Sequence, residues 1–252
     1  MIDTHCHLYL PHFRDDLDDV LKRASSENIT DICLPANGFE SLSQMDKLHH
    51  DAIRFHKMAG LHPCEFNEGM MLNEKRLWEE CSKDTFVAVG ETGLDYYWSK
   101  DFILKQKRSL HLHCEISKST KKPIVLHNRD ATNDLLDIIE TEQDGSLFGV
   151  WHCFTGSVDE GKRAIDLGLM LGIGGVVTFK NGGVDKSVAE LPLQSMILET
   201  DSPYLAPAPY RGKRNEPSFT ALVARKLAEI FDLDLSEIDS ITTNNAKRLF
   251  RI

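Results

Sequence analysis

Short apolar and β-branched runs alternate with stretches of helical length along the whole chain. Eight of these runs recur at fairly even intervals, and each has the length of a β-strand. They are Met1–His7, Thr30–Pro35, His56–Leu61, Thr85–Glu91, Pro123–His127, Leu147–His152, Leu169–Val177 and Ser195–Thr200. Eight alternations of strand and helix favour a parallel barrel over an open, doubly wound sheet.

The segments between these runs carry the apolar periodicity of amphipathic helices. One face of 15–26 holds Leu17, Val20, Leu21 and Ala24, and a stripe along 101–119 holds Leu104, Leu110, Cys114 and Ser117. Segments 159–167 and 219–231 have a similar pattern. Residues 236–251 are expected to form a final helix, with Ser236 as its N-cap and Glu237 in its first turn.

Chain length fits one domain of this kind. A (β/α)8 barrel needs about 250 residues, and the chain has 252, with no internal repeat, low-complexity segment or linker. We therefore predict an α/β fold with a single domain over residues 1–252, a (β/α)8 TIM barrel followed by an extra C-terminal helix.

Charge and composition narrow the function classes. A net charge of −10 argues against a generic nucleic-acid coating protein, which would be basic. It leaves room for an enzyme acting on nucleic acid, because bound cations and the basic loop Arg211-Gly212-Lys213-Arg214 can supply attraction. No apolar run approaches the roughly 20 residues of a membrane span, and no secretory signal is present, so we expect a cytoplasmic protein without a membrane partner.

Six scattered cysteines form no CxxC pair, and in a cytoplasmic protein we expect them to be reduced. Cys6 and Cys153 each follow or precede a histidine in the sequence. Because side chains alternate along a strand, we expect both thiols to face away from those histidines and pack under helices.

Polar, metal-capable residues end several of the predicted strands. His5 and His7 are separated by one residue, so they share one strand face. The others are His62, Glu91, His127, His152 and Asp201. In a parallel barrel these ends converge on the C-terminal face, where catalytic residues lie. Any one histidine alone could be a hydrogen-bonded core residue. The whole set is costly to bury without partners, and divalent metal ions would supply them.

Four histidines and two carboxylates suffice for two divalent ions, with zinc, magnesium and manganese as candidates. Two such ions lie about 3.5–4 Å apart in known two-metal sites and clamp the attacking and leaving oxygens of a displacement. Glu91, in the middle of the barrel, is our candidate for the bridging carboxylate.

Seven short motifs resemble the TatD family of metal-dependent deoxyribonucleases, in family order from residue 1 to the C-terminal helix. They are Asp3-Thr4-His5-Cys6-His7, Gly60-Leu61-His62-Pro63, the run Val89 to Tyr97 (VGETGLDYY), His127-Asn128-Arg129-Asp130-Ala131, His152-Cys153-Phe154-Thr155-Gly156, the run Glu199 to Leu205 (ETDSPYL) and the run Tyr210 to Pro217 (YRGKRNEP).

The resemblance implies an amidohydrolase-type barrel that hydrolyses DNA phosphodiesters, commonly as a 3′→5′ exonuclease. It implies one ion held by His5, His7, Glu91 and Asp201, and a second held by Glu91, His127 and His152. Some barrel relatives use a carbamylated lysine at the fourth strand; Glu91 at that position favours the nuclease branch.

The predicted roles follow from the chemistry of phosphodiester hydrolysis. Asp201 is the candidate to orient or deprotonate the attacking water, and Arg129 fits a phosphate clamp, with an ion pair to Asp130 or Asp95 as the alternative. His62 would donate a proton to the leaving oxygen or contact a phosphate, or else cap its loop.

Further contacts with a polymer are open to the exposed motifs. Arg211, Lys213 and Arg214 would hold the substrate backbone unless they form a solvated turn. Tyr96, Tyr97 and Trp98 would stack on bases or pack as a lid.

DNA is therefore the expected substrate, preferably single-stranded or at frayed ends, and we expect a monomer. The rival enzyme class is a metal-dependent amidase or lactonase on the same barrel. A third class is a non-catalytic binding protein, which an open shell of histidines and carboxylates argues against, since structural metal sites are usually closed.

Overall fold

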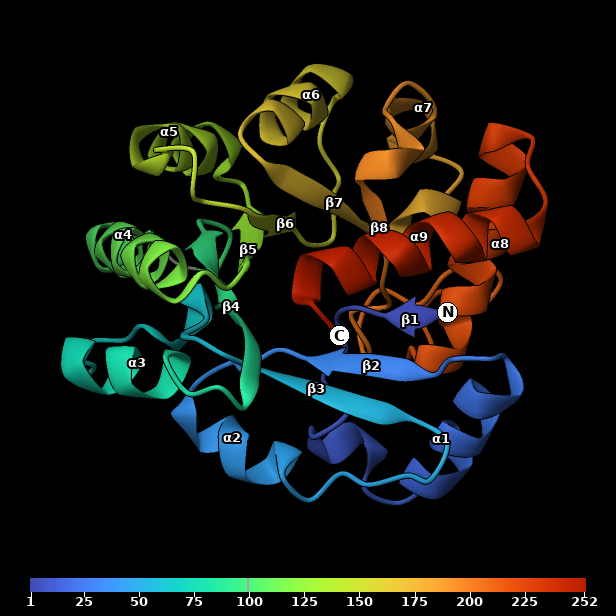
Figure 1. Ribbon diagram of the computed structural model, residues 1–252, viewed down its shortest axis with the longest axis horizontal. Coiled ribbons are helices and arrows are strands. Elements are labelled where there is room, and N and C mark those ends of the chain that lie inside the picture. Colours follow the sequence, from blue (N-terminus) through green and yellow to red (C-terminus); the bar gives the residue numbers. More distant parts are fainter. Residues whose placement is uncertain (99) are drawn as a thin grey trace.

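The computed structural model describes residues 1–98 and 100–252, in which eight parallel strands follow one another around a nearly closed barrel (Figure 1). Sheet order is the same as chain order, from β1 to β8. The strands are β1 Ile2–Asp3, β2 Asp31–Leu34, β3 Arg54–Ala59, β4 Phe86–Asp95, β5 Ile124–Arg129, β6 Gly149–Trp151, β7 Leu169–Ile173 and β8 Met196–Leu198. The predicted α/β barrel is confirmed.

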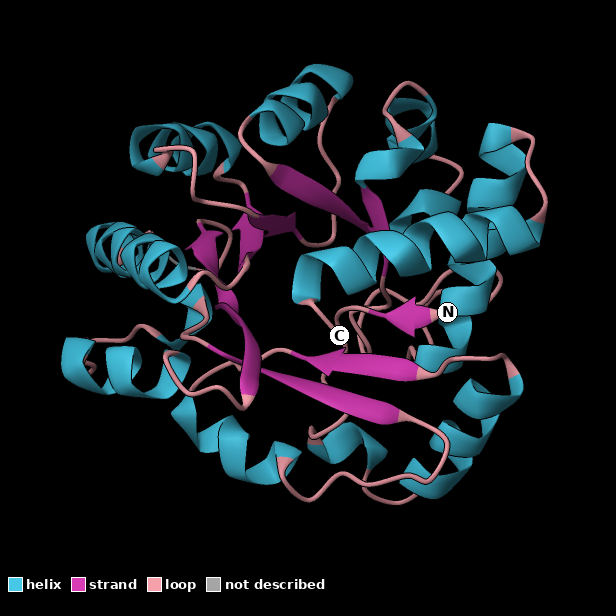
Figure 2. Ribbon diagram, in the orientation of Figure 1, coloured by secondary structure: helices cyan, strands magenta, loops and turns pink. Residues whose placement is uncertain are grey.

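Helices surround the strands on the outside of the ring (Figure 2). They are α1 Leu17–Ser26, α2 Phe39–Met45, α3 Glu74–Cys81, α4 Ile103–Thr120, α5 Thr132–Glu142, α6 Val158–Asp166, α7 Val184–Ala189, α8 Thr220–Phe231 and α9 Leu235–Phe250. The five helices expected from periodicity (α1, α4, α6, α8 and α9) begin and end within two residues of their predicted bounds. Across residues 1–98 and 100–252, no helix has both the length and the apolarity that crossing a membrane requires.

Two details of the helix predictions are wrong. Helix α9 begins earlier than expected, with Asp234 rather than Ser236 at its N-cap, and the Glu237 carboxylate accepts the Asp234 N–H at 3.1 Å. In α4, Leu104 is 82% exposed, whereas Leu110 and Cys114 are buried. At about 100° per residue, Leu104 lies about 120° around the helix from Leu110 and so misses the core-facing stripe.

Segments from the two ends of the chain close the barrel. Thr4 N–H donates to the Leu198 carbonyl at 3.0 Å, Asp201 N–H donates to the His5 carbonyl, and His7 N–H donates to the Ser202 carbonyl, the last two at 2.8 Å. Strand β1 ends at Asp3, earlier than the predicted run, so His5 and His7 lie in this closing segment.

The predicted alternation of faces holds in the closing segment. Cys6 between the two histidines is fully buried in a hydrophobic cluster with Leu8 and Phe13, as expected for a core thiol. Within residues 1–98 and 100–252 all six cysteines are free thiols.

Helix α9 crosses one end of the ring of strands (Figure 1). Its residues Ala246, Leu249 and Phe250 pack with Ile2 and Ile197, which lie near the N-terminal ends of β1 and β8. Asn245 fixes the helix there by donating to the carbonyl of Leu193, just before β8, and to that of Met196, the first residue of β8. Because this end is covered, the C-terminal ends of the strands are left to form the functional face.

Asp31 at the start of β2 joins β2 to β3 near the covered end. Its buried carboxylate accepts hydrogen bonds from Arg54 at 2.8 Å and 2.9 Å, from His56 at 2.7 Å and from Thr30 at 2.8 Å. Burial alone would raise the pKa of Asp31, but these donors outweigh it and hold the pKa well below the ordinary value of 3.8.

We predict that Asp31→Asn lowers the free energy of unfolding at pH 7 by about 2 kcal/mol, the usual contribution of hydrogen bonds to a charged group. A folded-state pKa below the unfolded one makes this contribution complete above pH 3.8 and progressively lost as the pH falls further. Chemical denaturation at pH 7 and at pH 3 should therefore show a smaller difference between wild type and variant at the lower pH. An equal difference at both would contradict the assignment.

Candidate metal centre

A bulge in β4 places Glu91 at the centre of the barrel. The pairing of β4 with β5 shifts register between Val89 and Thr92, so Glu91 lies in the middle of Phe86–Asp95 and not at a strand end as the sequence suggested. Gly90 and Gly93 flank it with φ of 156° and 137°, backbone conformations that side chains disfavour. The strand thereby continues past Glu91 to Asp95, a second acidic residue of the same face.

Imidazole nitrogens from five histidines surround the buried Glu91 carboxylate and divide between its two oxygens. Oε2 faces Nε2 of His5 at 3.1 Å and Nε2 of His7 at 3.6 Å. Oε1 faces Nε2 of His152 at 2.9 Å, Nδ1 of His127 at 3.1 Å and Nε2 of His62 at 3.3 Å. Burial alone would raise the pKa of Glu91, but the surrounding histidines hold it well below its ordinary range.

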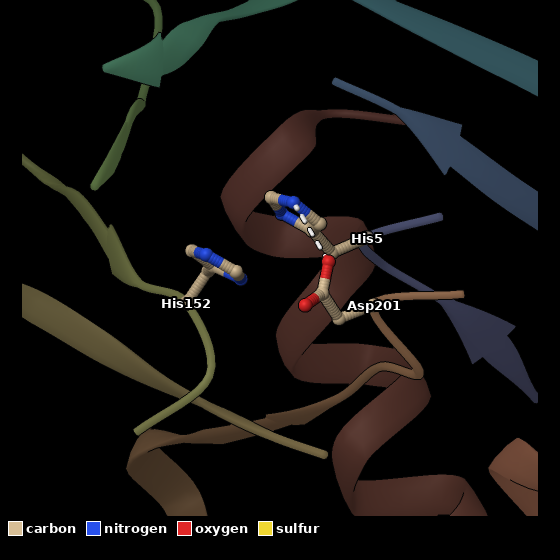
Figure 3. A group of neighbouring side chains, drawn as sticks. All are labelled: His5, His152 and Asp201. Atoms are coloured by element: carbon tan, nitrogen blue, oxygen red, sulfur yellow. Dashed lines mark ion pairs between the residues drawn. The ribbon is translucent and has the colours of Figure 1, made fainter. Parts of the chain in front are cut away.

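Asp201, just after β8, completes the cluster from the closing side of the barrel. Its Oδ1 lies 3.5 Å from Nε2 of His7 and 3.8 Å from Nε2 of His5. Figure 3 shows His5, His152 and Asp201 converging from three different segments. The rings of His5 and His152 stack with centroids 3.8 Å apart. The structure thus brings together all seven residues that the sequence placed at strand ends.

Groups on the far side of three histidines face one ring nitrogen each and leave the nitrogen that faces Glu91 to serve as a metal ligand. Tyr9 accepts from Nδ1 of His7 at 2.8 Å while its own hydroxyl hydrogen goes to the Pro35 carbonyl or to Asn37. Asp95 accepts from Nε2 of His127 at 3.0 Å. Glu199 Oε1 lies 3.3 Å from Nδ1 of His152. Metal-ligating histidines characteristically donate their second nitrogen in this way.

Sequence reasoning missed Tyr9 and Glu199 and saw Asp95 only as a partner for Arg129. Two sequence spacings could have pointed to Tyr9 and Glu199. Tyr9 and His7 share an i, i+2 spacing, and Glu199 precedes Asp201 by the same spacing. In the structure, Gly172 leaves the space that the Glu199 carboxylate occupies, because a Cβ at position 172 would lie 2.1 Å from Glu199 Oε2.

His62 has the opposite tautomer. The Cys64 N–H can only donate, and it donates to Nδ1 of His62 at 3.1 Å. Because Nδ1 accepts this bond, the ring proton lies on Nε2, facing Glu91, and burial, which lowers the pKa of His62, favours this neutral form. In this tautomer His62 offers a hydrogen-bond donor to the site, although its ring also lies in a possible metal-holding group with Glu91 and His127. Its predicted loop-capping role is also present, since this bond caps the short 3-10 helix Pro63–Glu65.

The donor set fits divalent metal ions. His5, His7, His127 and His152 offer nitrogen lone pairs, and Glu91 and Asp201 offer carboxylate oxygens, a mixture suited to zinc or manganese. Among the described residues, Nδ1 of His5 and Nδ1 of His152 are buried without a hydrogen-bond partner, and buried unsatisfied groups of this kind are typical of a site that an ion completes. Glu91 presents one oxygen to each group of histidines, as a bridging carboxylate would.

We predict that Asp95→Asn weakens metal affinity about 10–100-fold, the usual effect of losing the group that orients a ligating histidine. Asp95 is itself held by Gln106, which donates to its carbonyl and accepts from its N–H. Calorimetric titration with manganese would measure the change, and Asp130→Asn, an exposed neighbour just after β5, is the matched control. Unchanged affinity in Asp95→Asn would contradict the orienting role.

The predicted substrate residues lie outside this cluster. Arg129 forms neither of the ion pairs considered; its guanidinium lies over Tyr97 at 3.7 Å and Trp98 at 5.4 Å from the ring centroids. Tyr97 and Trp98 are 56% and 69% exposed, whereas the hydroxyl of the half-buried Tyr96 donates to Asp134. Arg129, Tyr97 and Trp98 thus form an exposed cation–aromatic platform on the rim.

The basic residues of the loop 211–214 differ in their contacts. Both terminal nitrogens of Arg214 donate hydrogen bonds to Asp16, at 2.7 Å and 2.6 Å, and its guanidinium lies over Phe13. Because these contacts occupy the guanidinium, Arg214 is not positioned to hold a substrate backbone as predicted. Arg211 and Lys213 are exposed, stacked against Phe179 and Tyr210.

Cys153 also differs from the prediction. It is only partly buried, and its pKa is raised well above the ordinary value by burial and by the site carboxylates. Strand β6 ends at Trp151, so alternation no longer governs the direction of the Cys153 side chain.

Comparisons with known proteins agree with this geometry. The chain matches the family model described as TatD related DNase over residues 2–251. It is 37% identical to an uncharacterized metal-dependent hydrolase of Bacillus subtilis (strain 168), YabD, over all of this chain and 99% of that protein. It is 34% identical to another, YcfH of Escherichia coli (strain K12), over all of this chain and 96% of that one. The crystal structure of YJJV, a TatD homolog from Escherichia coli K12, superposes with a TM-score of 0.90 at 29% identity, covering 100% and 98% of the two chains.

Proposed function

Because this chain belongs to the TatD family of metal-dependent hydrolases, we propose that it hydrolyses phosphodiester bonds of DNA at a two-metal site, as a 3′→5′ exonuclease. The observation that carries the proposal is the division of the Glu91 oxygens between two groups of imidazoles. Such a bridge is suited to a pair of ions, and a pair of ions is suited to in-line displacement at phosphorus.

Phosphodiester hydrolysis needs a nucleophilic water and stabilisation of charge on the phosphate oxygens. Divalent ions held by these ligands would lower the pKa of water and stabilise that charge. Asp201, with a side chain 14% exposed, is positioned to accept a hydrogen bond from the water and orient it. His62, with Nε2–H directed into the site, is a donor to a phosphate oxygen. A neutral imidazole favours this hydrogen bond over the full proton transfer considered as the alternative.

The residues on the rim of the site favour a flexible, single-stranded substrate. The platform of Arg129, Tyr97 and Trp98 combines a cation with exposed aromatic faces. Stacking of a base on such a ring contributes about 1–3 kcal/mol and requires an unpaired base. We therefore propose single-stranded DNA or frayed ends as the substrate, with Arg211 and Lys213 as further candidates for contact with its backbone. We retain a monomer as the expected state.

A side-by-side assay tests the proposed activity. Single-stranded oligonucleotides labelled at the 5′ end, and a panel of lactones and amides, would each be incubated with the protein and added manganese, magnesium or zinc. We expect a ladder of products shortened one nucleotide at a time from the 3′ end. Turnover of a lactone or amide without release of nucleotides would reject the proposal, and internal fragments would reject the exonuclease mode.

The tautomer of His62 gives a separate prediction. His62→Ala should lower kcat on DNA about 10²-fold, the usual loss of one preorganised donor, while the number of bound ions stays the same. Metal analysis alongside kinetics separates this result from the loss of a ligand. A variant that binds fewer ions than wild type would show that His62 is a ligand after all.

A further inference from the structure

A cleft of about 580 Å³ opens beside the metal centre on the C-terminal face. Its walls come from the segments that follow β1, β2 and β3, and its volume is within the range of about 300–1,000 Å³ typical of ligand pockets. The residues that matter here are Tyr9, Arg14, Asn37, Phe39, Leu61 and Arg76.

The inner wall of the cleft is built from residues that hold the site histidines. Tyr9 bonds Nδ1 of His7 at 2.8 Å. Asn37 accepts the N–H of His62 with its carbonyl at 2.7 Å and contacts the Tyr9 hydroxyl at 3.1 Å. A ligand in the cleft therefore lies within one side chain of both histidines, close enough to be continuous with a substrate bound at the centre.

Two arginines line the cleft without carboxylate partners. In the parts of the chain that the structure describes, neither Arg14 nor Arg76 forms an ion pair, although Glu40 and Glu65 line the same cleft. Six arginines elsewhere do pair with carboxylates: Arg23, Arg54, Arg108, Arg163, Arg214 and Arg225. In a chain with 39 acidic and 29 basic residues, two exposed guanidiniums that form no ion pair in one cleft are suited to an anionic ligand.

Part of the remaining wall is apolar, beside the polar Ser41 and Gln44. Leu10, Pro11, Leu61 and Met70 contribute to it, and the Arg76 guanidinium lies 4.4 Å from the centroid of the Phe39 ring. Apolar side chains beside guanidiniums match the two parts of a nucleotide, a base and a phosphate. A neutral lactone or amide would use neither arginine.

We propose that this cleft binds the nucleotide adjacent to the scissile phosphodiester, with its base against the apolar wall and its phosphate at Arg14 and Arg76. The assignment rests on the proposed nuclease function and names a place for the substrate on the β1–β3 side of the centre. The platform of Arg129, Tyr97 and Trp98 lies on the β4–β5 side, so a strand held at both would cross Glu91.

Binding of a fluorescein-labelled phosphorothioate tetrathymidylate, which resists hydrolysis, to the manganese-loaded protein tests this placement. Arg14→Gln combined with Arg76→Gln should raise Kd at least about tenfold, as expected for lost charge-assisted hydrogen bonds. The log–log salt slope should flatten by about 0.7, the contribution of the one single-strand phosphate that the two arginines would hold. Arg108→Gln, an exposed arginine on α4, is the control and should match wild type.

Two further double variants test whether binding depends on the charge in the cleft. Glu40→Gln combined with Glu65→Gln removes negative charge from the same cleft and should lower Kd. Arg14→Lys combined with Arg76→Lys should recover the salt slope, because the charge returns. Turnover of a small chromogenic phosphodiester, which needs only the metal centre, should stay at the wild-type rate in the glutamine variant.

The outcomes separate the two proposals. If the glutamine variant binds the oligonucleotide like wild type, or loses small-substrate turnover in proportion to binding, the cleft assignment is overturned while DNA hydrolysis by wild type still supports the nuclease. If wild type neither binds the oligonucleotide nor cleaves DNA, both proposals fail together.

Discussion

Glu91→Ala should lower kcat on a phosphodiester by more than about 10³-fold, because each ion of a two-metal site contributes several kcal/mol of charge stabilisation. A factor of ten in rate corresponds to about 1.4 kcal/mol, so a 10³-fold loss corresponds to about 4 kcal/mol. Disturbing both ions should cost more than that. The two oxygens of Glu91 face different histidine groups, and no other side chain of the cluster has that position in the described part of the chain. Kinetics at saturating manganese, with metal analysis of the same samples, measures the effect.

The matched comparisons are His127→Ala and His152→Ala, each of which removes one imidazole from the Oε1 side only. Both should retain more activity than Glu91→Ala. Glu115→Gln, on the exposed face of α4, controls for loss of a carboxylate elsewhere. Turnover near the wild-type rate in Glu91→Ala at saturating metal would show that the bridge assignment is wrong.

Removal of metal should abolish activity, and its return should stabilise the fold. At a free concentration about 100 times Kd, a bound ion adds about 2.7 kcal/mol to the free energy of unfolding. For a chain of this size, that corresponds to a rise in Tm of about 5–10 °C. Thermal denaturation of chelator-treated protein before and after addition of manganese, magnesium or zinc measures it.

The expected stoichiometry is two ions per chain. Six ligand residues are too many for a single tetrahedral site, and they divide around the two oxygens of Glu91. A stoichiometry of one, with full activity, would contradict the two-metal interpretation. Asp95→Asn should need more metal to reach the same Tm as wild type.

Periodicity along the chain predicted the barrel because strand and helix patterns are local properties. The seven residues of the cluster were predictable for the same reason, since parallel strands bring their C-terminal ends to one face. The exact position of Glu91 was not predictable. Its bulge depends on the register of β4 against β5 and on backbone conformations at Gly90 and Gly93, which no local pattern specifies.

Partners that are distant in sequence account for the other differences. The sequence predicted Arg214 to be free in a basic loop, but in the structure it is paired with Asp16, 198 residues away in the chain. The roles of the histidines likewise depend on what each far nitrogen meets. His7 and His62 are the same residue type beside the same carboxylate, but Tyr9 and the Cys64 N–H give them opposite tautomers. Such pairings appear only when the folded chain is known.

Closure of the barrel by residues 4–7 and 198–202 has a consequence for the order in which the protein is made. A chain emerging from the ribosome exposes His5 and His7 well before Asp201 and Ser202, because 194 positions separate Thr4 from Leu198 and synthesis adds only about 5–20 residues per second. Until then the Leu198, Asp201 and Ser202 groups that fix the first segment are missing. The nascent chain therefore carries most of its candidate ligands before the segment that completes the candidate metal centre has been made.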